Sequence, residues 1–176
     1  MPASAIDFTA VTHVIHFAAT PMPNGALNTN ANGLTLAKSS DIVSRTHTAG
    51  RKVLICIGGG GSQAGFQGAA SGANLPAFIS NITNFMAVRG YDGVDIDWEP
   101  LPTTDAQRFT NLINGLRIAL NGFPQPKMLT AAVGAYPPYG DSPTAQYVMF
   151  AALQSQFDQI NVMAYDMSGP YDGWVT

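Results

Sequence analysis

Glutamate is almost missing from this sequence, because Glu99 is the only one among its 176 residues. Charge of either sign is scarce: Asp, Glu, Lys and Arg together make up 11% of the chain, and the net charge is −3. The chain has no run of basic residues, which argues against nucleic acid as a partner. The few carboxyl groups that are present therefore need a specific explanation.

Cysteine and long apolar runs are also scarce. Cys56 is the only cysteine, which excludes an internal disulfide and a metal cluster built from cysteines. No stretch approaches the ~18–20 consecutive apolar residues of a membrane-spanning helix, so we expect no membrane partner. The N-terminal residues MPASAIDFTA do not form a basic start followed by an apolar run. If the protein is exported, we expect its signal peptide to be absent from this sequence.

The length predicts one domain over residues 1–176, and the hydrophobic residues, 46% of the chain, are enough for a sizeable core. Short apolar runs with many Val and Ile residues predict strands at 12–20, 52–59, 93–99, 128–136 and 159–166. The segments between them predict helices at about 36–49, 73–88, 103–120 and 142–157, with Thr103 and Ser142 as caps. Helix-length connections between buried strands favour parallel pairing. The sequence predicts an α/β fold of about five parallel βα units.

The predicted strand GVDIDWE holds the sequence's most unusual feature. Side chains alternate faces with period two, so its three acidic residues share one face: Asp95, Asp97 and Glu99. Alternating charge also fits a strand with one solvated face, but both faces of a parallel sheet are normally buried. Three carboxyl groups ~6–7 Å apart along a buried strand would share protons and titrate together. A raised pKa on the outermost carboxyl would suit a general acid.

Three ordered motifs carry a resemblance to a known family. They are an Asp-x-x-Asp-x-Asp-x-Glu pattern at 92–99, CIGG at 56–59 and MAYD at 163–166. Together they resemble the family-18 glycoside hydrolases, the chitinases and their relatives, whose fold is a (β/α)₈ barrel with its site at the carboxyl ends of the strands. The five units resemble the second to sixth of that barrel. We therefore expect an incomplete (β/α)₈ barrel, whose exposed strand edges favour self-association.

The resemblance implies a role for each residue of the acidic strand. Glu99 would be the general acid, and the N-acetyl oxygen of the sugar would be the nucleophile, as in substrate-assisted glycosidases. Asp97 would accept a hydrogen bond from the acetamido N–H, and Asp95 would support Asp97. Tyr165 would donate its hydroxyl to the acetamido oxygen. Asp92 is out of step with the alternation that places these three carboxyl groups on one face, so we expect it to be structural.

The resemblance also implies how the sugar is bound. Met163 and Asp166 would line the floor of the sugar subsite. Independently of the resemblance, Tyr136 lies in a Pro-rich loop after a predicted strand end, where it could stack on a sugar ring. Gly58 and Gly59 would allow tight backbone packing beside the sugar. The implied partner is chitin or chitooligosaccharides, with the chitobiose core of N-glycans as a related substrate. The reaction needs no cofactor or metal, and the implied location is extracellular.

Several alternatives remain open. The chain could be a chitin-binding protein with weak or no catalysis, or an unrelated open α/β protein in which the acidic motif is a coincidence. The glycine-rich segment GGGGSQAG loosely matches a dinucleotide fingerprint, but the acidic residue that this fold requires further along is missing. His13 and His16 fall on opposite faces of a predicted strand, which is poor geometry for a metal.

Cys56 replaces the serine of the family motif, and its strand parity places it near Asp95. A thiol is a weaker hydrogen-bond donor than a hydroxyl, although Cys56 could equally be a small apolar core residue. We predict that Cys56→Ser leaves the rate of chitooligosaccharide hydrolysis equal or higher, as measured by steady-state kinetics. A large loss of rate in this variant would contradict the prediction and show that the thiol itself is needed.

Overall fold

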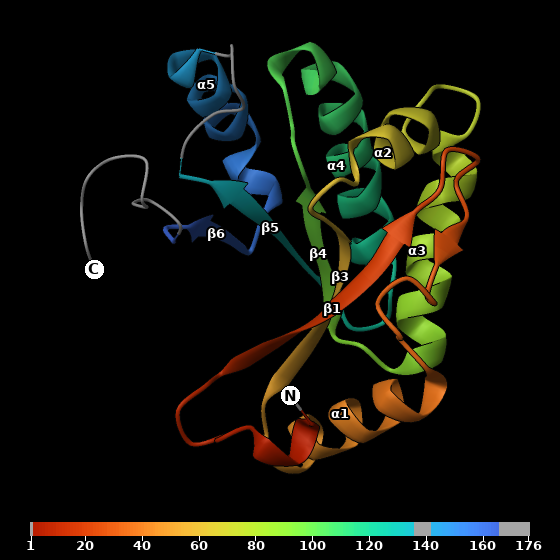
Figure 1. The fold of residues 1–176 in the computed structure, drawn as a ribbon, viewed down its shortest axis with the longest axis vertical. Helices are drawn as coiled ribbons and strands as arrows, with labels where there is room; N and C mark the ends of the chain where they lie inside the picture. The colour runs from red at the N-terminus through yellow and green to blue at the C-terminus, as the bar shows by residue number, and fades with distance from the viewer. Residues whose placement is uncertain (1, 136–141, 166–176) are drawn as a thin grey trace.

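The computed structural model describes residues 2–135 and 142–165, which fold around one sheet with strand order β2-β1-β3-β4-β5-β6 (Figure 1). Five neighbouring strands run parallel: β1 (His13–Pro21), β3 (Lys52–Gly59), β4 (Gly93–Trp98), β5 (Met128–Gly134) and β6 (Gln159–Met163). The short strand β2 (Leu27–Asn28) pairs antiparallel with the end of β1. The five predicted parallel strands are therefore confirmed, and β2 is an addition to them.

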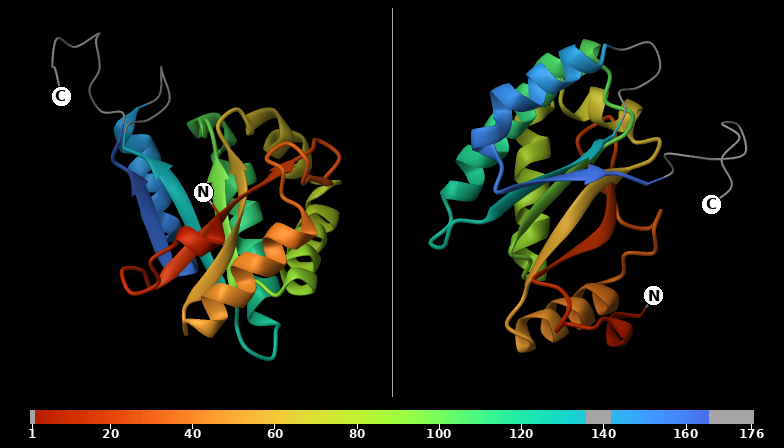
Figure 2. Two further views of the ribbon diagram at one scale, coloured as in Figure 1. Left: turned by 60° about the horizontal axis from the view of Figure 1, so that its bottom comes forward. Right: turned by 90° about the vertical axis from the view of Figure 1, so that its left-hand side faces the viewer.

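Helices cover one face of this sheet, and its other face is open (Figure 2). The helices are α1 (Leu36–Thr48), α2 (Gln63–Ala69), α3 (Leu75–Arg89), α4 (Ala106–Asn121) and α5 (Pro143–Leu153). Short 3₁₀ turns form at Ala3–Ala5, Thr103–Asp105 and Gln154–Gln156. None of the described helices is both long and apolar enough to cross a membrane. The described part of the chain is thus an α/β fold with a curved sheet that does not close.

Several predicted boundaries were wrong by a few residues. Thr103 does not cap α4, because a 3₁₀ turn intervenes and Asp105 occupies the N-cap position. Ser142 does occupy the N-cap position of α5, but that helix ends at Leu153 and continues only as a 3₁₀ turn. Helix α2 was not predicted, because its seven residues contain two glycines and follow a glycine-rich turn. Strands β5 and β6 also end earlier than predicted.

The hydrophobic core lies between the sheet and the helices. Strand β4 contributes Val94, Ile96 and Trp98 to it, each fully or almost fully buried. The Trp98 ring stacks on Phe66 of α2, with centroids 4.6 Å apart, and meets the edge of Phe109 of α4 at 6.2 Å. Each such buried side chain contributes roughly 1.5–3 kcal/mol to folding. The core thus fixes the face of β4 opposite the carboxyl groups.

Two aspartates that precede strands tie neighbouring strands together in the same way. The Asp92 N–H donates to the Val53 carbonyl at 2.8 Å, and the Asp92 carboxylate accepts the Val53 N–H at 2.9 Å. Asp158 repeats both bonds with Leu129, at 2.9 and 2.8 Å. These contacts at the amino ends of β4 and β6 help to set the strand register. Asp92 therefore has a structural role, as its place outside the alternation of the other three carboxyl groups predicted.

The outer strands of the sheet are β2 and β6. Strand β2 covers only Thr20 and Pro21 of β1, so most of β1 has no further strand beside it among the described residues. Val162 on β6 is 60% exposed and Ile15 on β1 is 39% exposed. Apolar strands with one unpaired edge favour association between chains. The expected self-association stays a prediction.

The Asp92 carboxylate gives the fold a pH dependence that can be tested. Burial alone would raise the pKa of Asp92, but hydrogen bonds from Val53 and His47 and the charges of His47 and Lys52 lower it. A lowered folded-state pKa adds stability above the unfolded value of about 3.9, and this stability is lost as the pH falls through the folded-state pKa. We predict that Asp92→Asn lowers the free energy of unfolding by about 1 kcal/mol at neutral pH.

Urea denaturation at several pH values measures this difference. We expect the gap between Asp92→Asn and the wild type to narrow below about pH 4. The matched control is Asp41→Asn, which removes an exposed ion pair with Arg45 on α1. Its expected effect is a few tenths of a kcal/mol at about pH 7. Equal effects of the two variants at that pH would show that Asp92 adds no more than a surface pair.

Candidate active site

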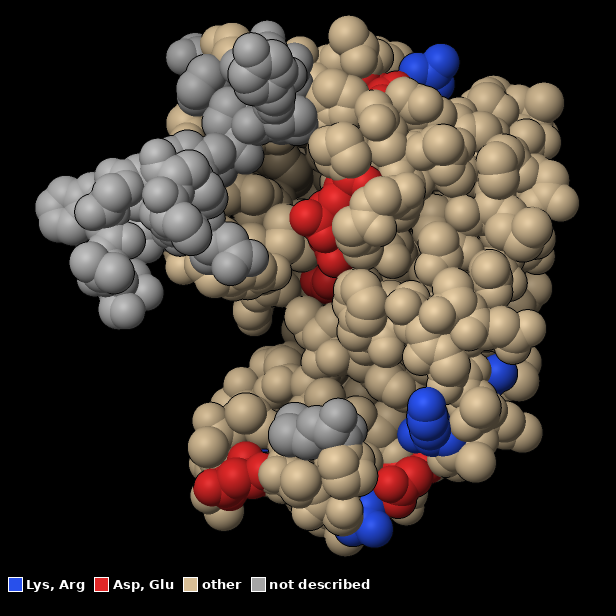
Figure 3. Space-filling view, viewed as in Figure 1, with Lys and Arg blue, Asp and Glu red and all other residues tan. Residues whose placement is uncertain are grey.

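The acidic face of β4 lines a cavity of about 440 Å³. Figure 3 shows acidic side chains gathered in the hollow at the middle of this side of the molecule. Five of the predicted site residues line the cavity together: Asp95, Asp97, Glu99, Met163 and Tyr165. They come from β4, from β6 and from the residues just after these strands. The fold therefore brings two separate sequence motifs to one place at the carboxyl end of the sheet.

Asp95 is the deepest of the three carboxyl groups, with 2% of its surface exposed. One of its oxygens accepts hydrogen bonds from the Thr130 hydroxyl on β5 and, at 3.4 Å, from the Asn161 amide on β6. Burial raises the pKa of Asp95, although hydrogen bonds from Thr130, Asn161 and Cys56 act in the opposite direction. Two neighbouring strands thus hold this carboxyl group in place.

Asp97 lies next along the row and is 6% exposed. Burial, together with the negative charges of Glu99 and Asp95, raises the pKa of Asp97 to about 7. One of its oxygens, Oδ1, is buried and has no hydrogen-bond partner among the described residues. An unpaired buried acceptor costs roughly 1–3 kcal/mol. Asp97 is therefore suited to accept a hydrogen bond from a ligand in the cavity.

Cys56 lies directly opposite Asp95 on β3, as its parity predicted. It is buried, and its Sγ is 4.0 Å from Oδ2 of Asp97. Burial and the nearby carboxyl groups raise the pKa of the thiol, so it stays protonated at neutral pH. The thiol is thus available as a weak donor to the carboxyl row.

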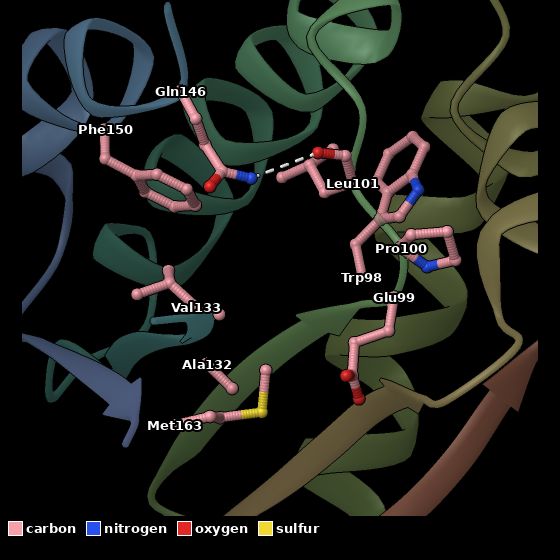
Figure 4. A pocket seen from close by; sticks show the side chains of 10 residues that line it. Trp98, Glu99, Pro100, Leu101, Ala132, Val133, Gln146, Phe150 and Met163 are labelled. Atoms are coloured by element: carbon pink, nitrogen blue, oxygen red, sulfur yellow. Dashed lines mark hydrogen bonds between the residues drawn. The ribbon is translucent and has the colours of Figure 1, made fainter. Parts of the chain in front are cut away.

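Glu99 follows β4 directly and is the most exposed carboxyl of the row. It lines the cavity of Asp97 and also a second cavity of about 150 Å³ beside it. Figure 4 shows Glu99 and Met163 on one side of this second cavity, with Gln146 and Phe150 of α5 on the opposite side. Glu99, Ala132 and Met163 line both cavities, so Glu99 stands at their boundary.

The two glycines that we predicted at the site, Gly58 and Gly59, allow close packing of β3 against its neighbouring strands. Gly58 has φ of 122°, and a Cβ there would lie 1.9 Å from the carbonyl oxygen of Asp97. Gly59 has φ of 103°, and its Cβ would lie 2.6 Å from the Phe17 ring. Both positions need glycine for close approach to β4 and β1. Sugar contact at these glycines stays a prediction, and Tyr136 and Asp166 lie outside the described residues.

Sequence reasoning missed four side chains at this site. Thr130 and Asn161 hold Asp95, while Ile15 and Phe17 of β1 line the larger cavity. Alternation along each strand would have placed Thr130 and Asn161 on the inner face. Their closeness to Asp95 depends on which residues of β4, β5 and β6 lie opposite one another, and alternation within a single strand does not give this pairing.

The histidines lie away from the carboxyl row. His16 Nδ1 is 2.8 Å from the hydroxyl of Tyr91, which satisfies the ring as a partly buried structural group. His13 Nδ1 is 2.9 Å from the Thr12 hydroxyl. Within residues 2–135 and 142–165, no group of three or more His, Cys, Asp or Glu side chains could hold a metal ion.

The chain resembles known proteins in both sequence and fold. The sequence profile of Glycosyl hydrolases family 18 matches residues 3–176. This chain belongs to glycosyl hydrolases family 18. Chitotriosidase-1 of Mus musculus is 34% identical over 173 residues, which cover 92% of this chain and 36% of the mouse protein. A probable endochitinase of Caenorhabditis elegans is 36% identical over 128 residues, which cover 68% of this chain and 20% of that protein.

Solved structures of the family share the fold. The crystal structure of Ostrinia furnacalis Group IV chitinase matches with a TM-score of 0.82 and 22% identity, covering 98% of this chain and 48% of that chain. The chain thus spans about a third of the mouse family member and about half of the insect structure. The fold class, a partial and unclosed version of the family-18 barrel, is confirmed.

Asp97 gives this family-18 site a measurable pH signature. A carboxyl whose folded-state pKa is raised from about 3.9 to about 7 stabilises the fold fully only below its unfolded pKa. That contribution is lost as the pH rises through about 7. We predict that Asp97→Asn is more stable than the wild type at about pH 8, by about 1–2 kcal/mol, and that the difference shrinks towards about pH 5. Urea denaturation at both pH values measures it, and a pH-independent difference would contradict the raised pKa.

Proposed function

We propose that this protein hydrolyses β-1,4 linkages between N-acetylglucosamine units in chitin or chitooligosaccharides. The observation that carries the proposal is the buried carboxyl row that ends at Glu99, with an unpaired oxygen of Asp97 beside it. Both curated relatives described above are named as chitin-degrading enzymes. A structural neighbour, the Group II chitinase catalytic domain 2 of Ostrinia furnacalis, was solved with (NAG)5 bound.

The first step would break the glycosidic bond. Glu99 in its protonated form donates its proton to the glycosidic oxygen, which departs with the leaving sugar. At the same time, the acetamido oxygen of the other sugar attacks the anomeric carbon of its own ring. The bond to the leaving sugar breaks, and a cyclic oxazolinium forms. The unpaired Oδ1 of Asp97 accepts the acetamido N–H and so orients the nucleophile. Tyr165, in the same cavity, would donate its hydroxyl to the acetamido oxygen.

The second step would restore the site. Glu99, now a carboxylate, takes a proton from a water molecule that attacks the anomeric carbon from the side vacated by the leaving sugar. The acetamido group is released, and two inversions at the same carbon give net retention. The oxazolinium is positively charged, so negative charge on the Asp95 and Asp97 pair stabilises it. The hydrogen bonds from Thr130 and Asn161 hold Asp95 in position for this task.

Because Glu99 lies between two cavities, we can propose which cavity holds the sugar on each side of the bond that is broken. A general acid must lie beside the oxygen that joins the two sugars. The larger cavity, which contains Asp97 and Tyr165, would take the sugar that carries the reacting acetamido group. The smaller cavity, lined by Gln146 and Phe150, lies on the leaving-group side of Glu99. Met163 lines both cavities and would contact the sugars on each side of the scissile bond.

A direct test compares the wild type with Glu99→Gln. Gln keeps the shape of the side chain but has no acidic proton to transfer, so we predict that kcat falls about 100- to 10,000-fold on a fluorogenic chitooligosaccharide. The control is Asp41→Asn on α1, which should keep the wild-type rate. Fluorescence release under identical conditions measures all three proteins.

Two outcomes would go against this proposal. Equal rates for the wild type and Glu99→Gln would rule out Glu99 as the general acid. No turnover by the wild type, combined with saturable chitooligosaccharide binding by calorimetry, would instead favour the chitin-binding alternative. The complete motif of Asp95, Asp97 and Glu99 supports the enzyme, because a binding protein has no need of a general acid.

We also propose that the protein acts outside the cell. Chitin is an insoluble polymer, so an enzyme that degrades it must reach it there. One relative, 30% identical over 115 residues, is named Secreted chitinase LysM12 of Penicillium expansum.

A further inference from the structure

The glycine-rich segment that precedes α2 ends in a serine that contacts the backbone on both sides of Trp98. The Ser62 hydroxyl donates to the carbonyl oxygen of Asp97 at 3.3 Å and accepts the Glu99 N–H at 3.2 Å. Ser62 is 3% exposed, so water does not compete freely for these two bonds. A single hydroxyl group therefore links the two residues to which we assign the chemistry.

The Ser62 hydroxyl supplies the hydrogen bonds that a neighbouring strand would otherwise make beyond the end of β3. The ladder between β3 and β4 stops at the pair of Gly59 and Trp98, where β3 turns away. Beyond that point, the Glu99 N–H has no residue of β3 opposite it. The Ser62 side chain takes over as the partner on this side of β4. Without it, the Asp97 carbonyl and the Glu99 N–H would each lose a hydrogen bond in a buried place.

The first turn of α2 completes the attachment. The Gln63 N–H donates to the Glu99 carbonyl at 3.2 Å, so both backbone polar groups of Glu99 are bound to this turn. Phe66, one turn later, stacks on Trp98 at 4.6 Å. These contacts fix the Cα of Glu99, from which its carboxyl group extends to the boundary of the two cavities.

Further along α2, the same helix anchors the loop that leaves the site. The Gln67 amide donates to the Asp105 carboxylate at 2.7 Å, and Asp105 is 1% exposed. Arg108 binds the other oxygen of Asp105 at 2.8 Å. Helix α2 therefore holds the loop between β4 and α4 at both of its ends. The attachment at Glu99 is the one that bears on catalysis.

We propose that Ser62 is a positioning residue for the general acid Glu99. It acts through the backbone of Asp97 and Glu99 and touches no substrate. A proton donor must lie within hydrogen-bond distance of the leaving oxygen, and a displacement of about 1 Å can cost about 100-fold in rate. This inference rests on the proposed function, because it takes Glu99 to be the acid. It also gives the segment GGGGSQAG a role: its glycines turn the chain so that Ser62 reaches β4.

The test compares Ser62→Ala with Ser62→Thr and with Ser71→Ala. Threonine keeps the hydroxyl that alanine removes. Ser71 is the matched control, because its hydroxyl donates to the Gly68 carbonyl at 2.7 Å at the far end of α2, away from Glu99. We expect Ser62→Ala to lower kcat on a fluorogenic chitooligosaccharide about 10- to 100-fold with KM within about twofold of the wild type. Ser62→Thr should restore most of kcat, and Ser71→Ala should keep it.

A second readout does not depend on catalysis. Amide hydrogen exchange of Glu99 reports whether its N–H is still bound, and we expect faster exchange in Ser62→Ala than in Ser71→Ala. Equal exchange in these two variants, or a wild-type kcat in Ser62→Ala, would overturn the proposal. So would a loss of kcat that merely follows the unfolded fraction seen by circular dichroism. If Glu99→Gln equals the wild type in rate, the proposed function fails, and the exchange measurement alone decides whether Ser62 holds Glu99.

Discussion

Three carboxyl groups lie in a row along β4 and the residue after it, with Asp95 and Asp97 buried, and this row is the constraint on which the structure depends. Charged carboxylates in a row repel one another and lose their hydration. Each member of the row meets that cost differently. Asp95 is held by hydrogen bonds from two neighbouring strands, Asp97 takes up a proton near neutral pH, and Glu99 reaches into open cavities. The three environments differ, and these differences are the basis for the different roles that we propose for the three carboxyl groups.

Apolar packing on the opposite face of β4 offsets the free-energy cost of this carboxyl row. Val94, Ile96 and Trp98 pack under the helices, and Trp98 is clamped between rings of α2 and α4. The core thus positions the carboxyl groups to within the precision of a packed side chain. A change in the packing of Trp98 would move Glu99, the next residue along the chain. Core and site thus share β4, with the core residues on one face and Asp95 and Asp97 on the other.

Much of the fold could be read from periodic patterns. Five apolar runs separated by helix-length segments predicted the parallel sheet, and alternation within GVDIDWE predicted which side chains face the cavity. Boundaries and short elements were less predictable. Helix α2 and the 3₁₀ turn at Thr103 lie in segments whose local preferences are weak, and contacts with β4 and α4 decide their structure. The hydrogen bonds of Thr130 and Asn161 with Asp95 likewise depend on register between strands, which no single segment encodes.

The sequence by itself determined the strands, the inward face of the acidic row and the family to which its motifs belong. Those features follow from the order of residues within one segment, where chain geometry leaves little choice. Only the tertiary structure decided how protons and contacts are shared at the site. The pKa of Asp97 is raised to about 7 because burial and two neighbouring carboxyl groups act on it together. The backbone of Glu99 is held by Ser62 and Gln63, which lie more than thirty positions away along the chain. Such contacts exist only after distant segments have packed.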